Sequence, residues 1–380
     1  MVGPVSLAIL THFEGLTDPR VDRGKLHNLI DIVAITLCAF LCGAEGWEDV
    51  ERYGRIKRNW LAKWLELPNG IPSHDTFRRV FNALKPAEFV TCLQSFVANI
   101  QQECKGRHIA IDGKTVRRSF DTATNRAALH LVSAWSTDVG VSLGQVAVDS
   151  HSNEITAVPS LLALLELEGA VVTLDAMHCQ KETAAAIRER DADYVLTVKA
   201  NQAKLHETLH ETFLGYAEKD FQIPQLRRHT TEERRHGRYE KREYFVVPAP
   251  KALLQSGEWR DLETIGMVIR TRQVGDKEPT TEVSYHIASL PPKVKRFARV
   301  VRGHWSIENT LHWSLDVTFS EDRSRIRTGK GPENVALLRR LTLSILKQDT
   351  SLDESLRGKR LMAGWDDQTL ERILCGFQGK

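Results

Sequence analysis

With 380 residues, the chain is long enough for two or three domains and a large core. Its 42% hydrophobic and 27% charged residues are typical of an ordinary soluble globular protein. The net charge of +3 is too small to indicate a nucleic-acid partner by itself, although positive charge gathers at residues 52–63, 227–242, 293–302 and 323–330.

Cysteine spacing and the apolar segments exclude several other classes of protein. The six cysteines form no C-x-x-C pair, so we expect a reducing, cytoplasmic compartment and no structural zinc. The first residues contain no basic leader, which predicts that there is no secretory signal. The longest apolar run, residues 32–44, is too short to span a bilayer and predicts a buried helix, so we expect no membrane partner.

The first hundred residues are predicted to be all-helical, with helices over 26–42, 47–65, 74–84 and 86–101. In the second helix basic residues alternate with Tyr53, Trp60 and Trp64, as expected for a DNA-facing helix in a helix-turn-helix-like module. The alternative is that the tryptophans belong to the core and the charges form a solvated face.

Beyond residue 105 the hydrophobic period changes from helix to strand. Strands are predicted over 107–114, 129–137, 143–150, 171–175 and 194–198, and helices over 155–167 and 181–190. The order of three strands, helix, strand, helix, strand predicts a mixed α/β sheet.

A helix over 202–216 is followed by a segment of different character. Strand-like runs at 244–247, 264–270 and 282–288, with flanking prolines, predict a β-rich insertion. The last long helix is predicted over 332–347, and the remainder is a polar, partly helical tail.

Residues 302–334 combine a helix with a cationic loop. Ser306 predicts a helix start, and His304, Glu308, His312 and Asp316 recur every four residues as one polar stripe. A satisfied polar network or a solvated face would explain the stripe. The sharper hypothesis is a carboxylate that faces a metal ion, with cations nearby to hold a phosphate. The cations of the loop are Arg323, Arg325, Arg327 and Lys330.

Two predicted buried strands each end on an aspartate, Asp112 and Asp175. A charge at the end of an apolar strand is costly unless it is paired or binds metal, although capping and turns also use aspartate there. If Glu308 joins the two aspartates, three oxygen donors without cysteine would suit two Mg²⁺ ions, or Mn²⁺.

Five ordered motifs carry a resemblance to a known family. They are IAIDGKTVRRS (109–119), VTLDAMHCQKETA (172–184), DYVLTVKANQ (193–202), HGRYEKREYF (236–245) and HWSIENTLHWSLDVTFSEDRSRIR (304–327). Together they resemble the DDE transposases of bacterial insertion sequences, in the H-repeat-associated branch linked to Rhs loci. The similarity covers nearly the whole chain.

The resemblance implies an α/β fold: an RNase H-like mixed-sheet core with a β-rich insertion, preceded by the helical domain. The implied domains are 1–102 (helical, DNA-binding or associated), 103–220 (core, first part), 221–291 (insertion), 292–350 (core, second part) and 351–380 (tail). It also implies that Asp112, Asp175 and Glu308 form the catalytic triad and hold two Mg²⁺ ions.

The chain departs from the Y-x2-R-x3-E-x6-K signature of the wider superfamily, because Val301, His304 and Leu315 stand at its tyrosine, arginine and lysine positions. His304 could still donate to a phosphate when protonated. The missing lysine would be replaced by Arg323, Arg325 or Lys330, or its role is absent, and second-strand processing, such as a hairpin intermediate, is left open.

The implied chemistry is hydrolysis at each element end, after which the freed 3′-OH attacks target DNA. The implied partners are double-stranded DNA, as element ends and target, and a second copy of the chain. An RNase H-like nuclease that does not join, and a non-catalytic DNA-binding regulator, are the alternatives. For His178 an ordinary loop histidine is the alternative. The predicted DNA contacts are Lys114, Arg117, Arg118, His178, Lys199, Asn201, Gln202, His304, His312, Arg323, Arg325, Arg327 and Lys330.

Overall fold

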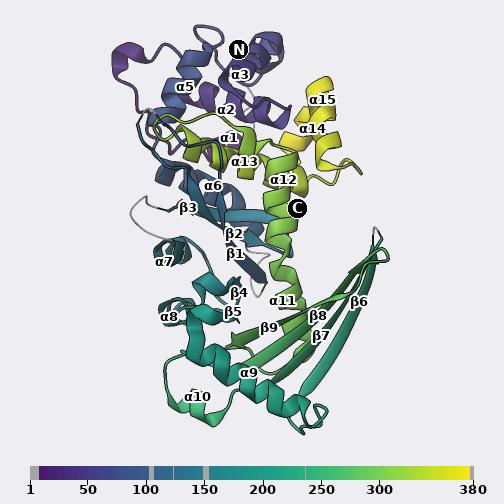
Figure 1. The fold of residues 1–380 in the computed structure, drawn as a ribbon. Coiled ribbons are helices and arrows are strands. Elements are labelled where there is room, and N and C mark those ends of the chain that lie inside the picture. Colours follow the sequence, from purple (N-terminus) through teal and green to yellow (C-terminus); the bar gives the residue numbers. More distant parts are fainter. Residues whose placement is uncertain (1–7, 102–106, 123, 149–153, 236, 377–380) are drawn as a thin grey trace. The chain divides into compact units, whose positions relative to one another are not determined.

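The computed structural model describes residues 8–101, 107–122, 124–148, 154–235 and 237–376 (Figure 1). The chain divides into two compact units. Unit 1 comprises Met1–Glu103, Gly113–Ser152 and Glu308–Lys380, and unit 2 comprises Cys104–Asp112 and Asn153–Ile307. The predicted boundary at residues 102 and 103 lies outside the described residues, as do the last two residues of the strand predicted over 143–150. None of the helices in the described part is long and apolar enough to cross a membrane.

The N-terminal part of unit 1 is helical, as predicted. Its longer helices are α2 (Leu29–Leu41), α3 (Trp47–Ile56), α5 (His74–Ala83) and α6 (Pro86–Gln101), with short α1 (Ala8–Thr11) and α4 (Arg58–Leu61). Helix α2 is buried from Asp31 to Leu41 and forms the centre of this region. Gly43 ends it with a φ of +106°, a value that residues with a Cβ rarely adopt. The helix predicted over 47–65 is divided into α3 and α4.

The rest of unit 1 places one long helix against two strands. Strands β2 (His130–Ser136) and β3 (Val141–Ala147) pair antiparallel. Helix α13 (Gly331–Gln348) is buried along most of its length and contacts β3, α2, α5 and α6, so it is the central element of the unit. Helices α14 (Leu356–Trp365) and α15 (Asp367–Cys375) form the tail.

Unit 2 is built on parallel strands. Strand β1 (His108–Thr115), which continues into unit 1, pairs with β4 (Val171–Leu174), and β4 pairs with β5 (Asp193–Val198). Helices α7 (Glu154–Ala163) and α8 (Lys181–Arg188) lie between these strands in the chain. The mixed α/β sheet is therefore confirmed, and its strand order is β3-β2-β1-β4-β5-β9-β8-β7-β6.

The predicted insertion extends this sheet. After α9 (Ala203–Ala217), strands β6 (Arg227–Arg235), β7 (Arg238–Pro248), β8 (Thr264–Val274) and β9 (Thr280–Ala288) pair antiparallel, with α10 (Lys251–Gln255) between β7 and β8. Strand β9 pairs with β5, so the insertion and the parallel strands share one sheet. The strand β6 was not predicted, because its sequence RRHTTEERR has no apolar face; as an edge strand it needs none.

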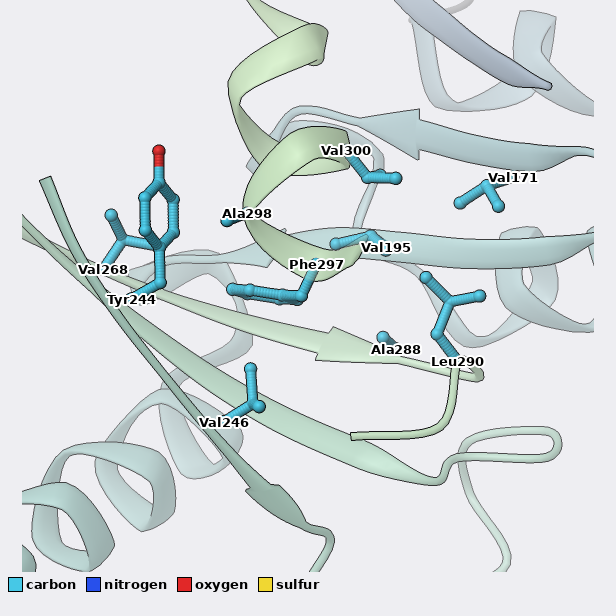
Figure 2. Packing of buried hydrophobic residues seen from close by; sticks show 10 residues of the cluster. All are labelled: Val171, Val195, Tyr244, Val246, Val268, Ala288, Leu290, Phe297, Ala298 and Val300. Carbon is cyan, nitrogen blue, oxygen red and sulfur yellow. The ribbon is translucent and has the colours of Figure 1, made fainter. Parts of the chain in front are cut away.

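Helix α11 (Val294–His304) covers one face of the strands of unit 2. Figure 2 shows Phe297 and Ala298 of α11 facing Tyr244, Val246 and Val268 of β7 and β8. A Cβ at Gly266 would collide with the ring of Phe297, so a glycine in β8 permits this close packing.

The segment after α11 corrects the helix predicted to start near Ser306. The helix begins at Val294, and Ser306 lies inside a helical run that continues as a π-helix over Ile307–His312 and as α12 (Trp313–Val317). Ile307, Leu311 and Leu315 are fully buried, and this anchoring explains why the segment stays helical without a cap at Ser306.

Candidate active site

Asp112 and Asp175 lie at matched positions of two neighbouring parallel strands. Ile111 of β1 pairs with Leu174 of β4, and each aspartate is the residue that follows, Asp112 still within β1 and Asp175 just past the end of β4. Neighbouring strands are about 4.8 Å apart, and residues in register point to the same face. Both aspartates are half-buried. The structure therefore brings two of the three predicted carboxylates to the same edge of the sheet.

The residues that follow Asp175, here named the Asp175 loop (175–180), form a tight turn. The Oδ1 atom of Asp175 accepts a hydrogen bond from the backbone N–H of Ala176 at 2.6 Å, which starts a short 3₁₀ helix. Asn201 Nδ2 donates to the carbonyl oxygen of Ala176 at 2.7 Å, and Gln202 Nε2 donates to that of Cys179 at 2.9 Å. Lys199 Nζ lies 3.7 Å from Asp175 Oδ1.

A network of histidines and hydroxyls lies on the face of the sheet that carries the aspartates. Thr173 precedes Asp175 by two residues, and its Oγ1 lies 2.7 Å from His108 Nε2 and 3.0 Å from His304 Nδ1. Burial lowers the pKa of His304 to about 4, although the negative charge of Asp175 opposes the shift. His304 is therefore neutral at pH 7, and any phosphate contact there would use a neutral ring.

His178 is buried inside the Asp175 loop, with 1% of its surface exposed. Its Nε2 lies 3.1 Å from Glu154 Oε2 at the start of α7. The position is that of a histidine packed inside the loop, and its contact with DNA, like the alternative of an ordinary loop histidine, stays a prediction.

Glu308 is exposed on the π-helix and belongs to unit 1, so its meeting with the two aspartates stays a prediction. A π-helix within an α-helical run is rare and frequently marks a functional position. The π-helix changes the polar stripe predicted from four-residue spacing. Four residues are less than one turn of a π-helix, so Glu308 and His312 do not lie directly above one another.

Lys114, predicted to hold DNA, is instead buried among carboxylates of unit 1. Its Nζ lies 2.8 Å from Asp316 Oδ1, 3.1 Å from Asp322 Oδ1 and 3.8 Å from Glu321 Oε2, and only 8% of its side chain is exposed. Burial raises the pKa of Asp316 even though Lys114 opposes the shift. The ammonium group of Lys114 is occupied within the protein.

A second ion pair supports the same segment from α13. Arg340 Nη1 lies 3.0 Å from Glu321 Oε1, and both side chains are fully buried. His312 lies beside Arg340 and Lys114, and burial together with these two cations lowers its pKa to about 3. His312 is therefore neutral at pH 7.

The remaining predicted cations of unit 1 gather on two adjoining loops. Arg327 donates to the carbonyl oxygen of Arg118 at 2.9 Å and lies over the ring of Phe120, and Arg126 donates to the carbonyl oxygen of Gly329. These contacts join the segment that holds Arg118, Phe120 and Arg126 to the segment that holds Arg327 and Gly329. The exposed cations on the two loops, here named the basic surface, are Arg117, Arg118, Arg323, Arg325 and Lys330. Arg117 also pairs with Asp322 at 3.2 Å.

The basic residues between 52 and 63 are largely paired with carboxylates of unit 1. Trp60 is buried and donates from Nε1 to Glu371 at 2.7 Å, and Lys57 pairs with Asp367 at 2.6 Å. This favours a core role for Trp60 over a DNA-facing one, and DNA recognition by the helical domain stays a prediction.

The donor set at the aspartates fits a hard cation, although no group of three or more His, Cys, Asp or Glu residues in the described part of the chain is arranged to hold one. Asp112 and Asp175 supply adjacent carboxylates that are half-exposed, and their oxygens are the ligand type that Mg²⁺ prefers. The DDE transposases usually use a divalent metal.

Several site residues were not predicted from the sequence: Thr173, His108, Glu154, Arg126 and Arg340. Two of them carried a usable signal. His108 and Thr173 precede the aspartates by four and two residues, and the two-residue period of a strand puts them on the face of the aspartates. The others depend on contacts between distant segments.

Two family models match consecutive parts of the chain. Residues 103–345 match the Transposase DDE domain, and residues 10–97 match the DDE_Tnp_1-associated family. The H repeat-associated putative transposase YhhI of Escherichia coli (strain K12) is 36% identical over 372 residues, which cover 97% of this chain and 98% of that protein. The Inactive transposase YbfQ of the same strain is 40% identical over 72 residues, which cover 19% of this chain and 86% of that protein.

A solved structure gives a weaker likeness. The cryo-EM structure of a piggyBac transposase synaptic complex with hairpin DNA covers 94% of this chain and 73% of that chain at 10% identity, with a TM-score of 0.41, which is too low to say more about the fold. The family model and the relatives decide the matter without it: as its motifs predict, the chain belongs to the DDE insertion-sequence transposases, in the H-repeat-associated branch.

Proposed function

We propose that the protein is an active DDE transposase that cleaves DNA at the ends of its insertion sequence and joins the freed 3′-OH to target DNA. The observation that carries this proposal is that Asp112 and Asp175 each directly follow the last paired residues, Ile111 and Leu174, of two neighbouring parallel strands. Glu308, the acid of the family motif in residues 304–327, is proposed as the third carboxylate.

The three acids are proposed to hold two divalent ions, Mg²⁺ or Mn²⁺, which would activate the attacking oxygen and stabilise the leaving oxygen of an in-line displacement. The residues of the chain are proposed to orient the carboxylates and to bind DNA. The Asp175 loop is fixed by Asn201 and Gln202, and the neutral ring of His304 fixes Thr173 beside it. The basic surface is proposed to bind phosphates of double-stranded DNA.

An RNase H-like core is proposed for the strands β1 to β5. The order of three strands, helix, strand, helix, strand supports it, as does the parallel pairing of β1, β4 and β5. The domain boundaries 1–102, 103–220, 221–291, 292–350 and 351–380 are part of the same proposal. A homodimer on DNA is proposed because both element ends must be processed.

The test is a DNA cleavage and joining assay on a plasmid that carries the native element ends. Wild-type protein with Mg²⁺ is expected to cut at the ends and to join pre-cut 3′-OH ends to a target plasmid. Asp112→Asn, Asp175→Asn and Glu308→Gln should each abolish both reactions while the affinity for end DNA stays within a few-fold.

Two other results would replace this proposal. Cutting without any joined product from pre-cut ends would identify a nuclease. Binding of end DNA with no cutting by the wild type would identify a regulator, a possibility to which the relative named an inactive transposase gives weight. Full activity of the Asp112→Asn variant would refute the metal-triad assignment.

A further inference from the structure

We propose that Asn201 and Gln202 are positioning residues, which hold the Asp175 loop in the shape that catalysis needs, and that they are not phosphate contacts. This inference rests on the proposed function. It reassigns two residues that the sequence predicts to bind DNA, because the structure gives their side-chain donors to the protein itself.

The Asp175 loop needs donors from elsewhere in the chain. Ala176, His178 and Cys179 are 4%, 1% and 0% exposed, so their backbone groups have little access to water. A buried carbonyl oxygen without a donor destabilises the fold. The 3₁₀ helix gives Ala176 O one donor, the N–H of Cys179 at 3.0 Å, to which a side chain adds a second, whereas Cys179 O takes its donor from a side chain outside the loop.

The two amides are placed to supply these donors by the topology of the sheet. Strand β5 pairs parallel with β4 and Leu196 is in register with Leu174, so residues 199–202 leave the sheet at the edge where Asp175 does. Asn201 Nδ2 donates to Ala176 O at 2.7 Å, and Gln202 Nε2 donates to Cys179 O at 2.9 Å and lies 3.2 Å from Gln180 Oε1. The loop is thus held at two points, at Ala176 directly after Asp175 and at Cys179 near the end of the loop.

The type of residue also fits a positioning role. An amide donates hydrogen bonds without bringing a positive charge, so it fixes the loop without neutralising the Asp175 carboxylate. Lys199 provides the contrast within the same segment. Its ammonium group lies 3.7 Å from Asp175 Oδ1, and 65% of its side chain is exposed, so it remains available to a DNA phosphate.

The experiment compares Asn201→Leu and Gln202→Leu with Lys199→Met, using the full chain. Gln222→Leu, which changes an exposed amide in the same unit, is the matched control. Three quantities are measured: the affinity for end DNA against salt concentration in EDTA, the single-turnover cleavage rate at saturating DNA with Mg²⁺, and amide hydrogen exchange in residues 175–180.

The positioning role predicts that Asn201→Leu and Gln202→Leu slow cleavage at saturating DNA by roughly 10–100-fold, as for other groups that orient metal ligands. DNA affinity should stay within twofold, and the Asp175 loop should exchange faster. Lys199→Met should weaken DNA binding and reduce the slope of log affinity against log salt by about one. Should Asn201→Leu fail to fold, Asn201→Asp keeps the side-chain shape and removes the donor.

Other outcomes overturn the inference. If Asn201→Leu and Gln202→Leu weaken DNA binding and reduce the salt slope while loop exchange and the cleavage rate at saturation match the Gln222→Leu control, the two amides are phosphate contacts. If wild-type protein neither cuts nor joins, the proposed function fails. In that case faster exchange in the loop still supports, and unchanged exchange still refutes, the holding role of the amides.

Discussion

The surroundings of Asp175 in unit 2 and the segment after Glu308 in unit 1 are held by different kinds of interaction. Around Asp175 the loop and its neighbouring strand are held mainly by neutral groups, namely two amides, the hydroxyl of Thr173 and the unprotonated ring of His304, while the charged Lys199 lies 3.7 Å from the carboxylate and stays largely exposed. After Glu308 they are ion pairs: Lys114 lies among three carboxylates, and Arg340 pairs with Glu321 without access to solvent.

This difference shows that a carboxylate can be held in position without losing its negative charge. Neutral donors fix a carboxylate or its loop without reducing the negative charge that a cation would need. Ion pairs hold a segment firmly, but each partner is costly to bury and depends on the other. We therefore expect the loss of one ion-pair partner in the segment after Glu308 to lower the free energy of unfolding strongly. The loss of one neutral donor near Asp175 should change the geometry of the loop more than the stability of the fold.

The largest effect is expected from the buried pair. Arg340→Met leaves the carboxylate of Glu321 buried without its main partner, so the free energy of unfolding should fall by about 3–5 kcal/mol. Chemical denaturation measures it. The double variant Arg340→Met/Glu321→Leu should recover much of the loss, since it removes both charges. A single variant as stable as wild type would contradict the comparison.

Lys114→Met comes next. Loss of the ammonium group leaves Asp316, Glu321 and Asp322 close together without their shared cation, and the free energy of unfolding should fall by about 3 kcal/mol. The affinity for DNA should change little, because Lys114 is not available to a phosphate. The prediction is wrong if stability is kept while DNA affinity and its salt slope both decrease.

A smaller effect is expected from pH in unit 2. Burial and the neighbouring His304 lower the pKa of His286 to about 3, from about 6.5 in an unfolded chain. Between these two pH values the unfolded chain binds a proton that the folded chain does not. The contribution of His286 to the free energy of unfolding is therefore fully present above pH 6.5 and is lost as the pH falls. From pH 7 to pH 5 the loss is about 2 kcal/mol for this histidine.

The check on His286 is a variant. His286→Gln retains a polar side chain opposite Thr197 but does not titrate, so its unfolding free energy should fall less between pH 7 and pH 5 than that of wild type. Denaturation at the two pH values measures the difference. Equal losses in the two proteins would show that other groups cause the acid sensitivity.

The strands that carry the aspartates could be predicted, because a short apolar run that ends in a charge is a strong local pattern. The edge strand β6 could not, since its sequence has no apolar alternation and an edge strand, paired on one side only, needs none. The π-helix could not either, because its hydrogen bonding depends on how Ile307, Leu311 and Leu315 are buried, and not on residue type.

The identity of the candidate site residues followed from sequence motifs, but their contacts did not. Lys114 after a strand suits a DNA backbone, and only the folded chain brings it to Asp322, which is 208 residues away in the sequence. The partners of Asn201 and Gln202 were equally open from the sequence, because an amide beside a catalytic strand can donate to a phosphate or to a carbonyl oxygen. Local sequence therefore specifies residue type, and tertiary contacts decide which partner is met.

The π-helix at Glu308 has a consequence for chain length in this segment. Every residue inserted into or removed from an α-helix rotates the part before the change by about 100° relative to the part after it. Leu311 and Leu315 are anchored in the interior, so removal of Asn309 or Thr310 would bring the backbone back to ordinary spacing and turn the Glu308 carboxylate toward another side of the helix. The direction of the Glu308 side chain thus depends on the number of residues in this segment. Insertion or deletion of one residue would change that direction more than most substitutions would.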